Sequence, residues 1–183
     1  LLTAIANSQT VTYGTNAPNG TVTYVGFVNG ENSSVIDTLA TVASTANGIV
    51  DAGTYAGNYI ASGAADNNYN FNYMTGNLTV LQRALMVTTN NVDNSIAAPN
   101  PVFTGSNNLL AADAVLINWM YAPIGYNGDP GIYTIGATAT DPSNRLNNYI
   151  RTNNYGLYNI GIAPPPPVSP VPSISPQLIS SLL

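Results

Sequence analysis

The stretch Gly48–Val80, GIVDAGTYAGNYIASGAADNNYNFNYMTGNLTV, carries the clearest strand and turn signals of the chain. Runs rich in Tyr, Ile, Thr and Val alternate there with clusters of Gly, Asn and Asp. This pattern is typical of short β-strands joined by tight turns. It predicts a β-hairpin or meander with strands over 54–60, 70–74 and 78–81. The expected turns lie at 51–53, 62–63, 66–68 and 75–77.

A weaker copy of this stretch runs from Gly128 to Ile160. The Asp-x-Gly-x-Tyr pattern that ends at Tyr55 recurs ending at Tyr133, an offset of 78 positions, and Tyr69 recurs as Tyr149, an offset of 80. Two further matches have offsets of 81 and 83: Ala17-Pro18-Asn19 with Ala98-Pro99-Asn100, and residues 2–7 with residues 85–90. Offsets that drift while the order is preserved indicate tandem units with small insertions and deletions.

We therefore predict a mainly β protein with two tandem small β-rich domains, residues 1–82 and a divergent second unit at 83–163. Each would be β-grasp-like or sandwich-like, with at most one short helix, expected at 31–37 and 111–116. Asn29 or Asn32 could cap the first helix, and Val35-Ile36 would fill the core. Further strands or extended segments are expected at 2–6, 9–13, 21–25, 39–46, 85–89, 102–104, 117–121, 133–139, 148–151 and 155–160.

Residues 164–183 form a Pro-rich tail that begins Pro-Pro-Pro-Pro and ends in an apolar, uncharged segment. Its composition favours an extended polyproline II conformation. We expect an arm that docks on a neighbouring copy, and the alternative is a linker to further sequence. The first residues show no signal peptide, so the chain is expected to be a mature product or a fragment of a longer protein.

The composition excludes several functions. Charged residues make up 6% of the chain, and its three cationic side chains are all Arg, so no basic patch for nucleic acid is expected. No run of about 18 apolar residues predicts a membrane span. Strands with few Lys or Glu lack the usual protection against edge pairing. This favours self-association, although a monomer with short, twisted strands is the alternative.

We predict no enzyme activity and assign no catalytic, cofactor-binding or metal-binding residue. The chain has no His, Cys or Lys, which removes the usual catalytic triads and their variants. Asp51, Asp66, Asp129 and Asp141 lie in turn sequences, where Asp commonly bonds its own backbone. Calcium is the ion that such oxygen ligands would suit, but Asp66-Asn67-Asn68 is only a weak cluster.

The 12 Tyr side chains allow two interpretations. Aromatic rings can stack on sugars, but Tyr also favours half-buried strand positions. We expect the second role for Tyr24, Tyr55 and Tyr73. For Trp119 we expect packing in the core or at an interface.

Several motifs of the first unit resemble the MBG-type repeat, which occurs in tandem in large secreted bacterial adhesins of the filamentous-haemagglutinin kind. The resemblance covers residues 9–87. The second unit is divergent, since it lacks a Tyr-Gly near position 95 and has Leu157-Tyr158-Asn159-Ile160 in place of L-T-V. The motifs that carry it are T-Y-G at 12–14, N-A-P at 16–18, V-G-F-V-N-G-E at 25–31, D-A-G-T-Y at 51–55, N-Y-N-F at 68–71, G-N-L-T-V at 76–80 and R-A-L-x-V at 83–87.

The resemblance implies an extracellular β-rich stalk or adhesion module, secreted or on the bacterial surface, without catalytic residues. Together with the composition it predicts a structural subunit or stalk segment of a surface fibre or adhesin. Such a protein would assemble as a homo-oligomer or filament through strand edges and terminal arms. The alternative is a module that binds glycans or host matrix through exposed Tyr.

Overall fold

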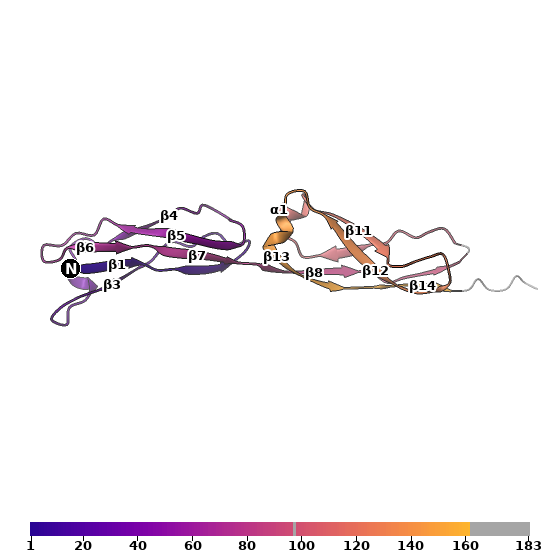
Figure 1. Cartoon of the computed structure of the whole chain (residues 1–183), viewed down its shortest axis with the longest axis horizontal. Helices are drawn as coiled ribbons and strands as arrows, with labels where there is room; N and C mark the ends of the chain where they lie inside the picture. The colour runs from indigo at the N-terminus through magenta and orange to yellow at the C-terminus, as the bar shows by residue number, and fades with distance from the viewer. Residues whose placement is uncertain (97, 162–183) are drawn as a thin grey trace, which may run out of the picture.

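A computed structural model describes residues 1–96 and 98–161, and this part of the chain is mainly β, as predicted. Its strands form four small sheets, two from the first unit and two from the second. Figure 1 shows the two units arranged end to end. The predicted Pro-rich tail, residues 164–183, lies outside the described residues.

The first unit consists of a three-stranded and a four-stranded sheet. Strands β3 (Val22–Val25), β1 (Leu2–Ala6) and β6 (Phe71–Met74) form the first, in the order β3-β1-β6. The second has the order β2-β7-β5-β4, with β2 at Gln9–Thr12, β7 at Gly76–Leu81, β5 at Gly53–Ser62 and β4 at Thr41–Ser44. The pairs β1–β6 and β2–β7 are parallel, and the other pairs are antiparallel.

The second unit repeats this topology strand for strand. Its sheets have the orders β10-β8-β13 and β11-β12-β14-β9, and again β8–β13 and β9–β14 are the parallel pairs. Two sheets per unit, without a long helix across one sheet, fit the sandwich-like alternative. The strands are β8 (Arg83–Thr89), β9 (Val92–Ser95), β10 (Gly105–Asn107), β11 (Asn118–Pro123), β12 (Gly131–Thr140), β13 (Tyr149–Asn154) and β14 (Leu157–Gly161).

Short helices form where they were predicted, at η1 (Ser33–Val35) and α1 (Ala111–Ala114). Asn32 caps η1, since its side chain accepts a hydrogen bond from the Ser34 backbone N–H at 2.9 Å. Of the two residues expected to fill the core, Ile36 is buried but Val35 is exposed. A further 3-10 helix, η2 (Arg145–Asn148), was not predicted.

The predicted hairpin or meander within Gly48–Val80 is wrong, because β6 leaves the sheet of β5 and β7 and pairs with β1 instead. The chain changes sheets at Gly76, where it passes so close to the Ala6 carbonyl oxygen that a side chain would collide with it. Gly156 passes the Thr89 carbonyl oxygen in the same way in the second unit. Strand periodicity does not show which sheet a strand joins.

Two further details differ from the prediction. The strand expected at 102–104 lies instead at Gly105–Asn107, paired with β8. Strand β9, with the sequence Val-Asp-Asn-Ser, was not expected. It is an edge strand that pairs only with β14, and Val92 is its one apolar residue, packed against the buried cluster of the second unit.

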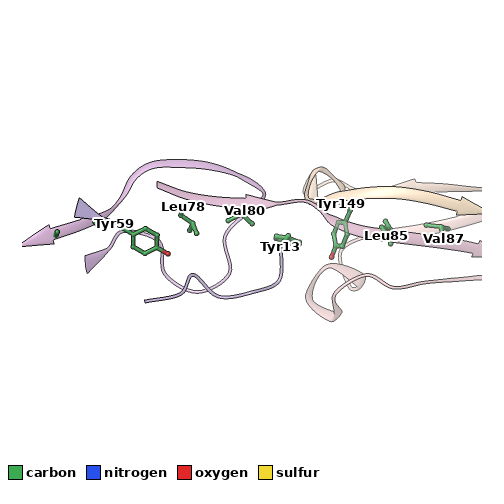
Figure 2. Packing of buried hydrophobic residues seen from close by; sticks show 9 residues of the cluster. Tyr13, Tyr59, Leu78, Val80, Leu85, Val87 and Tyr149 are labelled. Atoms are coloured by element: carbon green, nitrogen blue, oxygen red, sulfur yellow. The ribbon is translucent and has the colours of Figure 1, made fainter. Parts of the chain in front are cut away.

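One buried cluster spans the two units, in addition to a smaller cluster inside each unit. Gln82 is the single residue between β7 and β8, and buried side chains continue from one strand into the other. Figure 2 shows Leu78, Val80, Leu85 and Val87 in a row, with Tyr13 beside Tyr149 where the units meet. That residues 1–82 and 83–163 are separate folding domains stays a prediction.

Candidate functional site: the joint between the units

A buried aspartate joins the two units. Asp113, on α1 of the second unit, is only 3% exposed. Its Oδ2 accepts hydrogen bonds from the Tyr149 hydroxyl at 2.6 Å and from the Tyr13 hydroxyl at 3.0 Å. Tyr149 begins β13 of the same unit, whereas Tyr13 directly follows β2 of the first unit. The two rings meet edge to face with centroids 5.5 Å apart.

These contacts explain why a carboxylate can be buried here. An isolated charge away from water is costly unless it is paired and hydrogen-bonded. Asp113 has two hydroxyl donors, and the Arg145 Nε lies 3.8 Å from its Oδ1. Burial, and then the hydrogen bond to Asp113, raise the pKa of both Tyr13 and Tyr149. Both hydroxyls therefore keep the protons that they donate.

A second contact connects the Asp-Ala-Gly turn before β5 to η2. The Asp51 Oδ1 accepts hydrogen bonds from Arg145 Nη1 at 3.0 Å and from Asn148 Nδ2 at 2.9 Å. In return, the Ala52 backbone N–H donates to Asn148 Oδ1 at 2.7 Å. Asn148 is 3% exposed, so its two hydrogen bonds to the first unit are shielded from water.

A third contact is made by the glycine next to Tyr13. Gly14 has φ +94°, a left-handed conformation that favours glycine. A Cβ at this position would lie 2.7 Å from the Leu110 Cδ1 atom of the second unit. Gly14 thus supplies both the backbone conformation and the space for the Leu110 side chain. The Tyr-Gly pair packs on the second unit through both of its residues.

Sequence reasoning found only part of this site. It placed Asp51 in a turn, and Tyr55 does donate to the Asp51 backbone carbonyl at 2.8 Å. It missed that the Asp51 carboxylate bonds the other unit, and it did not single out Asp113. The available signal was a lone acidic residue within the apolar run Leu-Leu-Ala-Ala-Asp-Ala-Val-Leu.

The remaining acids named from sequence stay apart from the joint's central hydrogen bonds. Asp66 accepts from the backbone N–H groups of Asn68 and Tyr69, and Asp141 accepts from that of Leu146, as expected for turns. Asp129 accepts from the Asn127 side chain. Within residues 1–96 and 98–161, no three His, Cys, Asp or Glu side chains are grouped so as to hold a metal ion.

The aromatic residues mostly pack inside the units. Tyr24 and Tyr55 are half-buried as predicted, whereas Tyr73 is 39% exposed. Trp119 is half-buried against the shared core, with the Arg151 guanidinium carbon 4.8 Å from its ring centroid. No helix in the described part of the chain has the length and hydrophobicity to span a bilayer.

The fold and the joint define a class of protein: small two-sheet β modules connected in series. Residues 2–79 match the family model of the MBG domain (YGX type), so the first unit is similar to this domain. The resemblance stated from the sequence is confirmed over these residues, which include Tyr13-Gly14-Thr15. No curated protein and no solved structure shows significant similarity to the chain.

Proposed function

We propose that the chain is a rigid, non-catalytic segment of an extracellular structural protein, a stalk or fibre of a bacterial surface adhesin. The observation that carries this proposal is the buried joint, in which Tyr13 of the first unit bonds Asp113 of the second. MBG-type units are typical of adhesin repeats, which supports the extracellular assignment. The side chains of the joint form hydrogen bonds that connect the two units, and we therefore propose a mechanical function.

The connection between the units supports a rigid segment. Flexible domain linkers are usually rich in Gly and Ser, but here one residue separates β7 from β8. The Gln82 side chain donates to the Asn147 carbonyl at 2.8 Å, so even this residue is held by the second unit. A stalk needs such a fixed angle between successive modules if it is to project its tip from the cell.

Lateral association through strand edges is the second part of the proposal. Strands β3 and β6 are the edges of the three-stranded sheet, and β11 is an edge in the second unit. Each carries an apolar residue that is more than half exposed, namely Val25, Met74 and Met120. Uncharged edges of this kind favour pairing with another copy. The predicted arm at 164–183 would add to such contacts.

Binding to glycans or host matrix through exposed Tyr remains the alternative. Among the described residues, the two exposed tyrosines are Tyr73 and Tyr155, at 39% and 43%. They belong to different units, so they do not form one stacking platform. A glycan array probed with the purified chain tests this alternative, which would be favoured by reproducible hits that disappear in the Tyr73→Ala or Tyr155→Ala variants.

The stalk proposal is tested by immunogold electron microscopy of the cells that produce the protein, with antibodies against residues 1–161. We expect gold particles on extended structures outside the cell. Labelling confined to the cell interior would contradict the proposal. Deletion of residues 164–183 tests the arm separately, since assembly of the truncated chain equal to that of the intact chain would show that no arm is needed.

A further inference from the structure

The N-terminal end of the first unit repeats the hydrogen bonds that the second unit uses in the joint. In the second unit, the Tyr149 hydroxyl accepts from the Leu110 backbone N–H at 3.1 Å and donates to Asp113. In the first unit, the Tyr69 hydroxyl accepts from the Val28 backbone N–H at 3.2 Å and donates to the Glu31 carboxylate. Each unit therefore presents an acid and a tyrosine at this end.

The strand registers show that these residues occupy equivalent positions. Leu2 pairs with Phe71 in the first unit, and Leu85 pairs with Arg151 in the second. Tyr69 and Tyr149 each lie two residues before the paired position. The N–H donor and the acid are three residues apart in both units, at 28 and 31 and at 110 and 113, so a single offset of 82 relates the two pairs.

Exposure distinguishes the two copies. In the joint, Leu110 is half-buried and packs at Gly14, and Asn148 is buried against the Asp51 turn. The corresponding residues of the first unit are Val28, which is 56% exposed, and Asn68, which is also exposed. Glu31 is exposed as well, whereas Asp113 is buried. The first unit thus has residues equivalent to those that contact Tyr13, Gly14 and Asp51 in the joint, but its own copies are exposed to solvent.

We propose that this N-terminal end, formed by Val28, Glu31, Asn68 and Tyr69, is a docking surface for the C-terminal end of another MBG-type unit with a Tyr-Gly turn. The tyrosine hydroxyl of that unit donates to Glu31, its glycine packs on Val28, and its Asp-Ala-Gly turn exchanges hydrogen bonds with Asn68. Each of these contacts has its counterpart in the joint of this chain, at Tyr13, Gly14 and Asp51-Ala52.

The partner must be a unit that has a tyrosine at the position of Tyr13, as the first unit has and the second unit does not. Gln9 and Val92 occupy the same register against β7 and β14, so Ile96 stands where the first unit has Tyr13. Isoleucine has no hydroxyl to donate to Glu31. The second unit of another copy therefore lacks the central hydrogen bond of this docking mode.

The new joint would differ from the existing one in charge. Arg145 lies three residues before Asn148, and the residue three before Asn68 is Ala65. The ion pair with Asp51 thus has no equivalent, and docking would depend on hydrogen bonds and on apolar contact at Val28. The inference rests on the proposed stalk function only in assuming that such units follow one another in series.

The test is a fusion in which residues 1–83 precede the full chain of residues 1–183 directly. This places Leu1 where Ala84 stands, because β1 and β8 are related by an offset of 83 positions. The chain has no cysteine, so spin labels can be placed on Thr54→Cys of the added unit and Thr54→Cys of the original first unit. Double electron–electron resonance then reports how rigidly the new joint is held.

We expect a single narrow distance distribution, which broadens when Glu31→Ala is introduced in the original first unit. The same substitution in the added unit is the matched control and should leave the distribution narrow. A broad distribution in the unsubstituted fusion, or an added unit that is unfolded, would overturn the inference. The same fusion labelled across the existing joint, at Thr54→Cys of the original first unit and at Ile132→Cys, separates the two proposals. If that distance distribution is narrow, only the docking inference fails. If it is broad, the proposed stalk function fails as well.

Discussion

The Tyr13 hydroxyl lies 3.0 Å from the Asp113 carboxylate oxygen, although the two residues are 100 positions apart in the sequence. This hydrogen bond connects the Tyr-Gly pair of the first unit to helix α1 of the second unit. Tyr13 lies in the buried cluster with Leu78 and Val80 of its own unit, and its hydroxyl also has a structural role between the units. A tandem array built in this way has a fixed polarity, since the tyrosine lies at one end of a unit and the acid that accepts its hydrogen bond lies at the facing end of the next.

Replacing Tyr13 with Phe should weaken the joint and leave both units folded. The ring contact with Tyr149 remains, but Asp113 loses one of its two hydroxyl donors. Loss of a buried hydrogen bond to a charged group should lower the free energy of unfolding by about 1.5–3 kcal/mol, measured by guanidinium unfolding. The matched control is Tyr59→Phe, which removes a hydroxyl that donates to the Pro18 carbonyl at 3.0 Å within the first unit.

Both variants should lose stability, but only Tyr13→Phe should change the orientation between the units. Small-angle X-ray scattering measures this as a change in maximum dimension. An equal change in scattering for both variants, or none for either, would show that the Tyr13 hydroxyl does not orient the units.

Gly14→Ala should destabilise the joint more than Gly63→Ala destabilises the first unit. Both glycines have positive φ, +94° and +78°, so both substitutions strain the backbone. A Cβ at Gly14 would also meet Leu110, whereas a Cβ at Gly63 meets nothing within 4 Å. The difference between the two variants in guanidinium unfolding therefore reports contact with the second unit. Equal losses would mean that Leu110 moves aside without cost.

The polar contact at Asp51 should depend on Asn148 more than on Arg145. The Arg145–Asp51 ion pair is exposed on both sides, and such pairs contribute about 0–1 kcal/mol. Asn148 is buried and makes two hydrogen bonds to the first unit, so Asn148→Ala should cost more than Arg145→Gln. Guanidinium is itself a salt, so urea unfolding at low and high salt is the suitable measurement. A larger loss for Arg145→Gln would reverse this ranking.

The joint should lose stability at alkaline pH. Burial and the hydrogen bond to Asp113 raise the pKa of Tyr13 and of Tyr149 in the folded protein. In the unfolded chain the pKa of a tyrosine is about 10. Above that pH the folded chain binds more protons than the unfolded chain, so the free energy of unfolding falls as pH rises. Below it, these two groups add no pH dependence. Urea unfolding from neutral to alkaline pH should show a shallower fall in Tyr149→Phe, and an unchanged slope would contradict this assignment.

The sequence predicts the fold better than it predicts the joint. Strand runs such as Leu2–Ala6 and Gly53–Ser62 are set by local alternation and by turn residues, and they appear where they were expected. The pairing of β6 with β1 is not encoded locally, because alternation is the same in either sheet. The joint was missed because Asp113 and Tyr13 are distant in sequence, and each has an ordinary local role, in a short helix and at a strand end.

We expect Tyr13 and Asp113 to hold the two units together as one rigid body. Double electron–electron resonance on the full chain with Thr54→Cys and Ile132→Cys tests it most directly. Thr54 on β5 and Ile132 on β12 are exposed positions on equivalent strands, and the chain has no other cysteine. We expect a single narrow distance distribution that broadens with Asp113→Ala. A broad distribution in the chain with Asp113 intact would contradict it.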